Sequence, residues 1–275
     1  MRDLEGKVAV ITGAGHGIGR ETAVALASKG CRLAICDNNE AALEGVRHEL
    51  EEAGATVTAH AVDVSDREQV ARFASDVVEA HGEAHVLVNN AGVTVYASFE
   101  EHEIEDFEWI VGVNFWGVVY GTKAFLPLLK QRPEGHIVNI SSINGMIPFP
   151  NNGPYNAAKF AVRGFNKTLI QELRGSPIHI MSVHPGGIKT NIVSNMRYYK
   201  HAHQDINHQE LVDVFDRSAR TTADKAAKII ISGIKKNKKR LLVGTDAGIM
   251  DMMVRMFPLG ATRLTGILTE RLMKK

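Results

Sequence analysis

The chain has 275 residues, a formal net charge of +1 and an apolar share of 44%. This balance requires neither a nucleic acid nor an acidic surface as a partner, and the apolar share is ordinary for a globular protein with a substantial core. The two cysteines, Cys31 and Cys36, flank or lie within one predicted strand, too far apart for a disulfide. We therefore expect reduced thiols and a cytoplasmic protein. The N-terminus leads directly into the first strand without a signal peptide, and no apolar stretch reaches membrane-spanning length.

The first predicted strand, over residues 8–11, leads into a glycine-rich turn and then into a helix that extends to Lys29. Glycines permit a tight turn and let backbone N–H groups approach a pyrophosphate at the start of the helix. A lone glycine-rich turn is a weak signal, but here a strand precedes it and a helix follows it, as the motif requires. The turn predicts a dinucleotide site formed by Gly13, Gly15, His16, Gly17, Ile18 and Gly19.

A second strand is predicted over residues 32–36 and ends at Asp37. A carboxylate at this position can accept hydrogen bonds from the adenosine ribose hydroxyls, and it repels a 2′-phosphate. Asn38 and Asn39 follow, and no arginine or lysine stands immediately after Asp37 to hold that phosphate. The sequence therefore favours NAD over NADP. Asp37 could also cap the helix predicted over residues 40–53, and the two roles are compatible.

Strands and helices continue to alternate along the chain. Further strands are predicted over residues 56–62, 86–88, 136–140, 178–183 and 241–243, and further helices over 66–80, 104–129, 155–173 and 223–235. Nearly continuous apolar strands that alternate with helices predict a single α/β domain with a doubly wound parallel sheet, covered by helices on both faces. Ligands of such sheets bind beyond the carboxyl ends of the strands.

Tyr155 and Lys159 stand four residues apart, so they share one face of the predicted helix. A phenol ionises near pH ~10, and lowering its pKa to about 7 takes roughly 4 kcal/mol of preferential stabilisation of the anion. A fixed cation nearby in a poorly solvated site can supply much of this energy. The pair is therefore suited to exchange a proton with an alcohol or ketone oxygen. The spacing alone is common by chance, and its weight comes from the nucleotide motif that precedes it.

These motifs together resemble those of the single-domain short-chain dehydrogenase/reductase family, from about residue 5 to about residue 245. The matching motifs are Thr12-Gly-x-x-x-Gly-x-Gly19, Asp63-Val64, Asn89-Asn90-Ala91-Gly92, Asn114, Ser142, Tyr155-x-x-x-Lys159 and Pro185-Gly186. The resemblance implies a Rossmann-like, three-layer catalytic domain over residues 1–245 and an NAD-dependent oxidoreductase.

The resemblance also implies roles for single residues. Tyr155 would exchange the proton with the substrate, Ser142 would hold the substrate oxygen, and Asn114 would hold a water that links Lys159 to solvent. Ser141 is the alternative to Ser142. The cofactor would be contacted by Asp63 and Val64 at the adenine, by Asn90 and Gly92 near the ribose, and by Ile188 and Thr190 at the nicotinamide carboxamide. The alternative for the residues that follow strands is a purely structural role in turns or helix caps.

Residues 191–220 correspond to the substrate-covering segment of the family. Apolar side chains here and after Ser142 suggest an apolar pocket for a hydrophobic secondary alcohol or ketone; they are Ile143, Met146, Ile147, Phe149, Ile192, Val193, Met196, Tyr198 and Tyr199. His201, His203 and His208 could bind a metal ion, but they lack zinc-like spacing and a fourth ligand. We expect a solvated lid there, and no metal site.

Residues 246–275 extend beyond the family core, and we expect them to form a helical extension. Ile249, Met252, Met253, Met256 and Phe257 recur at helical spacing, which predicts packing on the chain itself or on a sister subunit of a homo-dimer or homo-tetramer. Peripheral membrane contact is the alternative, because the ends of this segment are basic. The basic run over residues 235–240 predicts a solvated connection after a helix, with anionic lipid or nucleic acid as the alternative.

Two other functions are compatible with these motifs. The first is an NADP-dependent carbonyl reductase of the same family. The second is a regulator that binds NAD without catalysis, which would have no need of the four residues Asn114, Ser142, Tyr155 and Lys159. Because all four are present, the sequence favours the enzyme.

Overall fold

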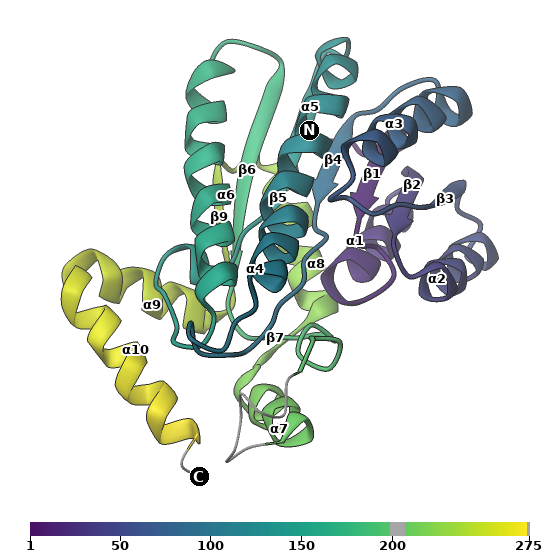
Figure 1. Ribbon diagram of the computed structural model, residues 1–275. Coiled ribbons are helices and arrows are strands. Elements are labelled where there is room, and N and C mark those ends of the chain that lie inside the picture. Colours follow the sequence, from purple (N-terminus) through teal and green to yellow (C-terminus); the bar gives the residue numbers. More distant parts are fainter. Residues whose placement is uncertain (199–206, 274–275) are drawn as a thin grey trace.

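The structure is a computed structural model that describes residues 1–198 and 207–273, with side chains up to residue 267. At its centre lies a seven-stranded parallel sheet with the strand order β3-β2-β1-β4-β5-β6-β9 (Figure 1). The strands are β1 (Val8–Thr12), β2 (Arg32–Asp37), β3 (Val57–Ala61), β4 (Val86–Asn89), β5 (Gly135–Ile140), β6 (Ile178–Pro185) and β9 (Arg240–Val243). The predicted doubly wound α/β fold is confirmed.

Helices cover both faces of the sheet. They are α1 (Gly17–Ala27), α2 (Glu40–Glu52) and α8 (Ala223–Lys235) on one face, and α3 (Arg67–His81), α5 (Gly117–Lys130) and α6 (Gly153–Glu172) on the other. Alternate residues of a strand point to opposite faces. In β1, Ala9 and Ile11 therefore pack under the first helix set, whereas Val8 and Val10 pack under the second. All four side chains are fully buried, which explains why the strand is apolar throughout.

The helix predicted over residues 104–129 is interrupted. It consists of α4 (Ile104–Val111), a π-helical turn (Gly112–Trp116) and α5. The side chain of Asn114 in this turn is engaged by the backbone of Val93, so a tertiary contact favours the wider turn. Such turns are frequent at functional sites.

The substrate-covering segment contains a helix that the sequence analysis did not predict, α7 (His208–Ser218). Asn207 and Glu210 begin it with a reciprocal capping box, in which each side chain accepts a hydrogen bond from the other residue's backbone N–H. The segment is framed by two short paired strands, β7 (Ile188–Lys189) and β8 (Thr221–Thr222). His201, His203 and Tyr199 lie outside the described residues.

The C-terminal extension forms α9 (Thr245–Met256) and α10 (Pro258–Met273), which protrude from the domain in Figure 1. Ala247 and Met250 of α9 pack against the loop after β5, and the Thr265 hydroxyl of α10 donates to the carbonyl oxygen of Pro148 at 3.1 Å. The extension therefore packs on its own chain. Much of the predicted stripe nevertheless faces outward, since Ile249, Met252, Met256 and Phe257 are exposed.

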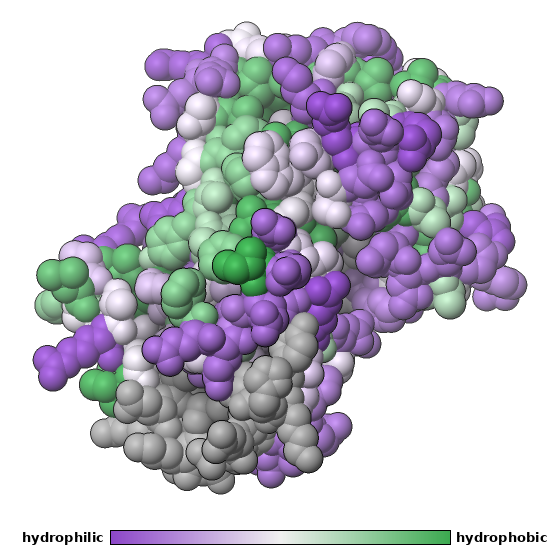
Figure 2. Space-filling view, viewed as in Figure 1, coloured by the Kyte–Doolittle hydropathy of each residue, from purple (hydrophilic) through white to green (hydrophobic). Residues whose placement is uncertain are grey.

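Figure 2 shows green apolar residues among purple polar ones on one face of the molecule, including the corner where Figure 1 places α9 and α10. Across the described parts of the chain, no helix is both long and apolar enough to cross a membrane. The basic residues that follow α8 are exposed in the turn before β9, as predicted for a solvated connection.

Candidate active site

The glycine-rich turn lies between the carboxyl ends of β1 and β4, where the direction of strand order reverses. Gly13 has a φ of +65°, and a Cβ atom there would lie only 2.6 Å from the Cα atom of Ala91. The Asn90 side-chain amide donates to the carbonyl oxygens of Thr12 (3.0 Å) and Gly13 (2.9 Å). A residue with a side chain would therefore not fit at position 13. The Asn90 side chain braces the turn, and its backbone N–H donates to the Thr12 hydroxyl oxygen at 3.0 Å. The predicted backbone contact with a cofactor would therefore involve its carbonyl oxygen.

The N-terminus of α1 opens out of this turn. His16 occupies the N-cap position in an extended conformation, but its side chain makes no capping hydrogen bond. Gly17 has a φ of +55°, and a Cβ atom there would lie 3.0 Å from the Thr190 methyl carbon. The uncapped helix end presents N–H groups and the positive end of the helix dipole, a combination that suits a pyrophosphate. The structure thus brings Thr190 beside the predicted phosphate-binding turn, and these residues fit a dinucleotide.

Asp37 lies at the end of β2, beside the same turn. Its carboxylate accepts hydrogen bonds from the backbone N–H groups of Gly15 (2.8 Å) and Asn39 (2.9 Å). The cap of α2 is Asn39, whose side chain accepts from Ala42 N–H at 3.0 Å. The alternative role of Asp37 as a helix cap is therefore wrong. Each carboxylate oxygen retains acceptor capacity for a ribose hydroxyl.

Asp63 lies in the turn after β3. One carboxylate oxygen accepts from both the backbone N–H (2.8 Å) and the hydroxyl (2.7 Å) of Ser65. The cap of α3 is Asp66, not Asp63. Val64 is buried, and the nearby Gly117 allows α5 to approach it closely. Asp63 therefore stabilises the turn through one carboxylate oxygen, and neither of these hydrogen bonds uses its second carboxylate oxygen.

Tyr155 and Lys159 lie on α6. The Lys159 ammonium nitrogen is 5.4 Å from the centre of the Tyr155 ring and donates to the Ile140 carbonyl oxygen at 3.2 Å. Lys159 is almost completely buried. A Cβ atom on Gly92 would lie 3.4 Å from this nitrogen and 2.8 Å from Asn114 Oδ1. Gly92 therefore lets the loop after β4, the π-helical turn and α6 meet at one point.

Burial dominates the acid–base properties of the pair. It raises the pKa of Tyr155 to about 12, and a hydrogen bond with the Ser142 hydroxyl offsets only part of this effect. Burial also lowers the pKa of Lys159 to about 8. In the protein without a cofactor, the pKa of the phenol is therefore not lowered, and the prediction that Lys159 supplies much of the stabilisation of the anion stays a prediction. Loss of hydration is the largest cause of both shifts. Further positive charge beside the phenol would lower the pKa of Tyr155.

Ser141 and Ser142 have different surroundings. The Ser141 hydroxyl is buried and donates to the Lys159 carbonyl oxygen at 2.9 Å. The Ser142 hydroxyl hydrogen-bonds with Tyr155 and accepts from the backbone N–H of Asn144 at 3.1 Å. Ser141 therefore anchors α6 to the strand, and this arrangement supports Ser142 as the residue that faces a substrate oxygen.

Asn114 lies in the π-helical turn and is completely buried. Its side-chain oxygen accepts from Val93 N–H at 3.1 Å, and its side-chain nitrogen donates to the Val93 carbonyl oxygen at 2.8 Å. An amide has a second N–H and a second lone pair. Asn114 can therefore brace the loop after β4 and still hold a water.

A buried polar network that the sequence analysis missed leads to Ser142. Its members lie on β4, β5, α6 and β6; in order they are Asn89, Asn139, Asn166, Ser182 and His184, joined by hydrogen bonds of 2.7, 2.8, 3.2 and 3.0 Å. His184 Nδ1 completes it at 3.2 Å from the Ser142 carbonyl oxygen. Burial lowers the pKa of His184 to about 4, so the ring is neutral. The polar residues within otherwise apolar strands could have indicated this network in the sequence.

The loop after β6 is held by the C-terminal extension. Asp246 in the first turn of α9 accepts a hydrogen bond from Gly187 N–H at 2.6 Å. A Cβ atom on Gly186 would overlap the same carboxylate. Ile188 follows this loop and is buried, and Thr190 lies beside Gly17 as described above. The extension therefore fixes the loop that carries both residues predicted to contact the nicotinamide.

The side chains predicted to form an apolar pocket are unevenly exposed. Those that are buried are Ile143, Met146, Ile147 and Met196. Ile143 and Met146 pack with Ala247 of α9, so part of the predicted lining is used in packing the extension. His208 stacks on Tyr198, and its Nε2 lies 3.0 Å from the Val193 carbonyl oxygen. The His208 ring therefore packs within the substrate-covering segment itself.

Comparisons with known proteins give a consistent result. The family model described as short chain dehydrogenase matches residues 7–200. SadH of Mycobacterium tuberculosis, which is named as an oxidoreductase, is 42% identical over 267 residues, covering 96% of this chain and 95% of SadH. The 3-oxoacyl-acyl-carrier-protein reductase FabG of Thermotoga maritima is 35% identical over 193 residues, covering 70% of this chain and 78% of FabG.

Solved structures agree with these relatives. A short-chain dehydrogenase/reductase of Burkholderia phymatum in complex with NAD has a TM-score of 0.85 and 30% identity, covering 93% of this chain and 96% of that chain. An alcohol dehydrogenase of Thermococcus sibiricus complexed with 5-hydroxy-NADP has a TM-score of 0.73 and 31% identity, covering 87% and 96%. Both forms of the cofactor therefore occur among the similar structures.

Proposed function

Because the chain belongs to the short-chain dehydrogenase family and is thus an oxidoreductase that binds a nicotinamide cofactor, we propose that it transfers a hydride between NAD and a hydrophobic secondary alcohol or ketone. The observation that carries this proposal is the convergence of Ser142, Tyr155 and Lys159, with Lys159 beside the loop after β4 that also contacts the glycine-rich turn. Family membership supports the reaction type. The choice of NAD and of substrate rests on Asp37 and on the apolar side chains around the site.

In the proposed reaction, Tyr155 takes the hydroxyl proton of an alcohol or returns it to a ketone oxygen. Ser142, which already hydrogen-bonds with Tyr155, holds the substrate oxygen toward the phenol. Lys159 is fixed by the Ile140 carbonyl and stabilises the tyrosinate form. When bound, an oxidised nicotinamide would supply the hydride acceptor and a positive charge beside the phenol. Asn114 holds the water through which Lys159 exchanges protons with solvent.

The remaining contacts follow the carboxyl ends of the strands. Asp37 would bind the ribose, Asp63 and Val64 the adenine, and Asn90 and Gly92 the adjoining part of the cofactor. The uncapped end of α1, from Gly13 to Gly19 with His16 and Ile18, would hold the pyrophosphate. Ile188 and Thr190 would contact the carboxamide.

An NADP-dependent reductase is the second candidate, and the Thermococcus sibiricus structure with 5-hydroxy-NADP gives it a specific basis. Asp37 argues against it, because its carboxylate stands at the strand end where a 2′-phosphate would be repelled. A regulator that binds NAD without catalysis would not need Tyr155, Lys159 and Ser142 in contact.

Three further proposals concern the setting of this site. Residues 191–220, with α7, would cover the substrate, and residues 246–275 would form a separate helical extension of the catalytic domain over 1–245. The exposed aromatic side chains Trp116 and Phe160 support assembly as a homo-dimer or homo-tetramer, which light scattering would measure. Two buried, unpaired cysteines, Cys31 and Cys36, support a reducing, cytoplasmic setting.

The experiment that tests the function is a panel of secondary alcohols and ketones, from short polar to long apolar chains, assayed with NAD and NADP. Absorbance of the reduced nicotinamide reports turnover. We expect turnover with NAD that improves with the apolar length of the substrate. Better turnover with NADP would support the second candidate, and no turnover with any substrate and either cofactor would support the regulator.

A further inference from the structure

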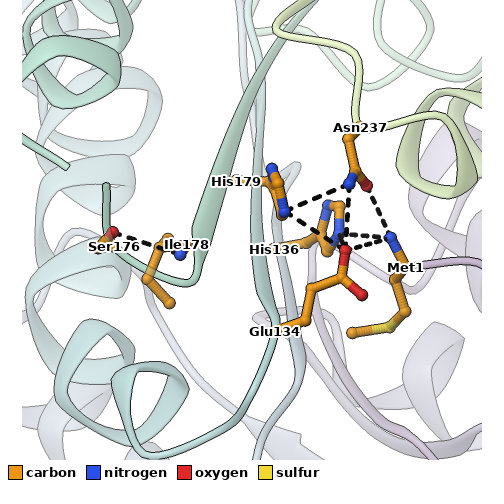
Figure 3. Close-up of polar contacts among 7 residues, drawn as sticks. All are labelled: Met1, Glu134, His136, Ser176, Ile178, His179 and Asn237. Atoms are coloured by element: carbon orange, nitrogen blue, oxygen red, sulfur yellow. Dashed lines mark hydrogen bonds and ion pairs between the residues drawn. The ribbon is translucent and has the colours of Figure 1, made fainter. Parts of the chain in front are cut away.

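Polar groups converge at the amino ends of the central strands β5 and β6, the ends opposite to the Tyr155 site. Glu134 precedes β5, His136 lies in β5, and His179 lies beside it in β6, where the two histidines are paired in register. Figure 3 shows these three side chains pointing toward one another, with Met1 and Asn237 at the same place. His136 lies six residues before Ser142, roughly 20 Å away along a strand. The cluster is therefore separate from the catalytic residues.

The three side chains have the spacing of metal ligands. Glu134 Oε1 lies 3.5 Å from His136 Nε2 and 3.3 Å from His179 Nε2, and the three ligand atoms all lie within 4.8 Å of one another. Zinc lies about 2.1 Å from its nitrogen and oxygen ligands, which places tetrahedral ligands about 3.4 Å apart. Two of the three separations already match this value, and a small rotation of one ring would adjust the third.

A positively charged group already lies in the cluster. The Met1 amino nitrogen is 2.5 Å from Glu134 Oε1, 3.2 Å from His136 Nε2 and 2.6 Å from Asn237 Oδ1. The acceptor atoms therefore converge on a point that holds a cation. A metal ion at this point would release the ammonium group or bind its deprotonated amine, and either this amine, Asn237 Oδ1 or a water would complete four-fold coordination.

The cluster can be reached from solvent. A hollow of about 600 Å³, lined by Met1, Arg2, Glu134, Lys235, Lys236 and Asn237, gives access from solvent. Its three basic side chains, Arg2, Lys235 and Lys236, are exposed, so water and salt screen their repulsion of a cation.

We propose that Glu134, His136 and His179 form a binding site for a divalent transition-metal ion, of which zinc fits the ligand set and spacing. The ion would tie the starts of β5 and β6 to the connection before β5. It would stabilise the folded protein, and it would take no part in hydride transfer. The sequence analysis expected no metal site because these ligands are separated along the chain and are joined by the sheet register.

The test uses full-length protein without a histidine tag, stripped with a chelator and titrated with Zn²⁺ in a calorimeter. We expect one ion per chain. The variant His179→Gln, at a half-exposed ring, should weaken binding at least about tenfold. The control is His48→Gln, because His48 forms an exposed pair with Glu52 at 3.5 Å but has no second histidine in that pair. This variant should bind Zn²⁺ like the wild type.

Two further measurements make the result independent of a single variant. Glu134→Gln should weaken binding as His179→Gln does, with circular dichroism confirming that each variant folds. Co²⁺ should give the visible absorption of a tetrahedral site in the wild type and lose it in both variants. The proposal is overturned if the wild type binds no Zn²⁺, or if both variants bind Zn²⁺ as tightly as His48→Gln. In either outcome the cluster only pairs the Met1 amino group with Glu134.

Discussion

The Lys159 ammonium nitrogen lies 5.4 Å from the centre of the Tyr155 ring and is held by the carbonyl oxygen of Ile140 at the end of β5. The sheet thus positions a buried cation beside the partly buried phenol. Burial acts against the charged form of both, raising the pKa of Tyr155 and lowering that of Lys159. The protein therefore prepares the site at a cost in stability, and the charge of a bound cofactor is needed to favour tyrosinate.

Replacing Lys159 with methionine should remove this cost and most of the activity. The pKa of Lys159 falls from 10.5 to about 8 on folding, so the folded chain binds the proton more weakly than the unfolded chain. The destabilisation is complete below pH 8 and fades as the pH rises to 10.5. Thermal unfolding of Lys159→Met should show a gain on the order of a few kcal/mol at pH 7, shrinking above pH 8.

The control for this prediction is Lys167→Met, which removes an exposed lysine from the same helix. It should leave the pH dependence of stability unchanged. If Lys159→Met lowered the stability at pH 7, burial of the charge would not be the dominant effect at this position.

Replacing Asp37 with alanine should weaken the discrimination between the two cofactors. The carboxylate no longer binds the ribose or repels a 2′-phosphate, so the ratio of kcat/KM for NAD to that for NADP should fall about tenfold or more. Asp66→Ala is the control, since Asp66 follows the next strand but only caps α3. Steady-state kinetics with both cofactors measures the ratio. An unchanged ratio in Asp37→Ala would show that another residue selects the cofactor.

His184→Phe should lower turnover by releasing the backbone of Ser142. The variant loses the contact of 3.2 Å to the Ser142 carbonyl oxygen and the contact of 3.0 Å to the Ser182 hydroxyl. Each of these buried groups then keeps one partner, Gly145 N–H for Ser142 and the Asn166 amide for Ser182. We expect a loss of stability of about 2 kcal/mol or more and a fall in kcat, with the Kd of NAD unchanged. Ser182→Ala is the matched control, because it removes only the side of the network that faces away from Ser142. Equal losses of kcat in both variants would mean that the network acts only through stability.

Asp246→Ala should weaken cofactor binding from the C-terminal extension. The variant loses the hydrogen bond to Gly187 N–H, in the loop that leads to Ile188 and Thr190. A hydrogen bond to a carboxylate contributes enough for the Kd of NAD to rise roughly tenfold. Asp251→Ala disrupts the ion pairs of α9 with Arg240 and Arg255 without touching this loop, and should change the Kd little. Quenching of tryptophan fluorescence would report both values, and identical effects would argue against a specific role for Asp246.

Local patterns in the sequence sufficed for much of the fold. Most strands of the central sheet are largely apolar runs bounded by turn residues, so the seven strands were predicted from residue types alone. The strand–glycine turn–helix pattern located the turn in which close contact with Ala91 leaves no room for a side chain at Gly13. These features depend on short-range geometry, which a single stretch of chain determines.

Features that depend on tertiary contacts could not be found in this way. The π-helical turn at Asn114 results from a contact with Val93, twenty-one residues away. The network from Asn89 to His184 and the cluster of Glu134, His136 and His179 exist only because parallel strands place distant residues in register. The helix α7 was missed although Asn207 and Glu210 form a recognisable capping box.

The most direct test of the proposed function is the effect of Tyr155→Phe on turnover and on NAD binding, measured with the best substrate of the panel. The variant keeps the ring that packs against Val95, Ala97 and Ile110 but lacks the hydroxyl that exchanges the proton. We predict a loss of kcat of at least about a hundredfold with the Kd of NAD unchanged. Turnover close to that of the wild type would contradict the assignment of Tyr155 as the acid and base.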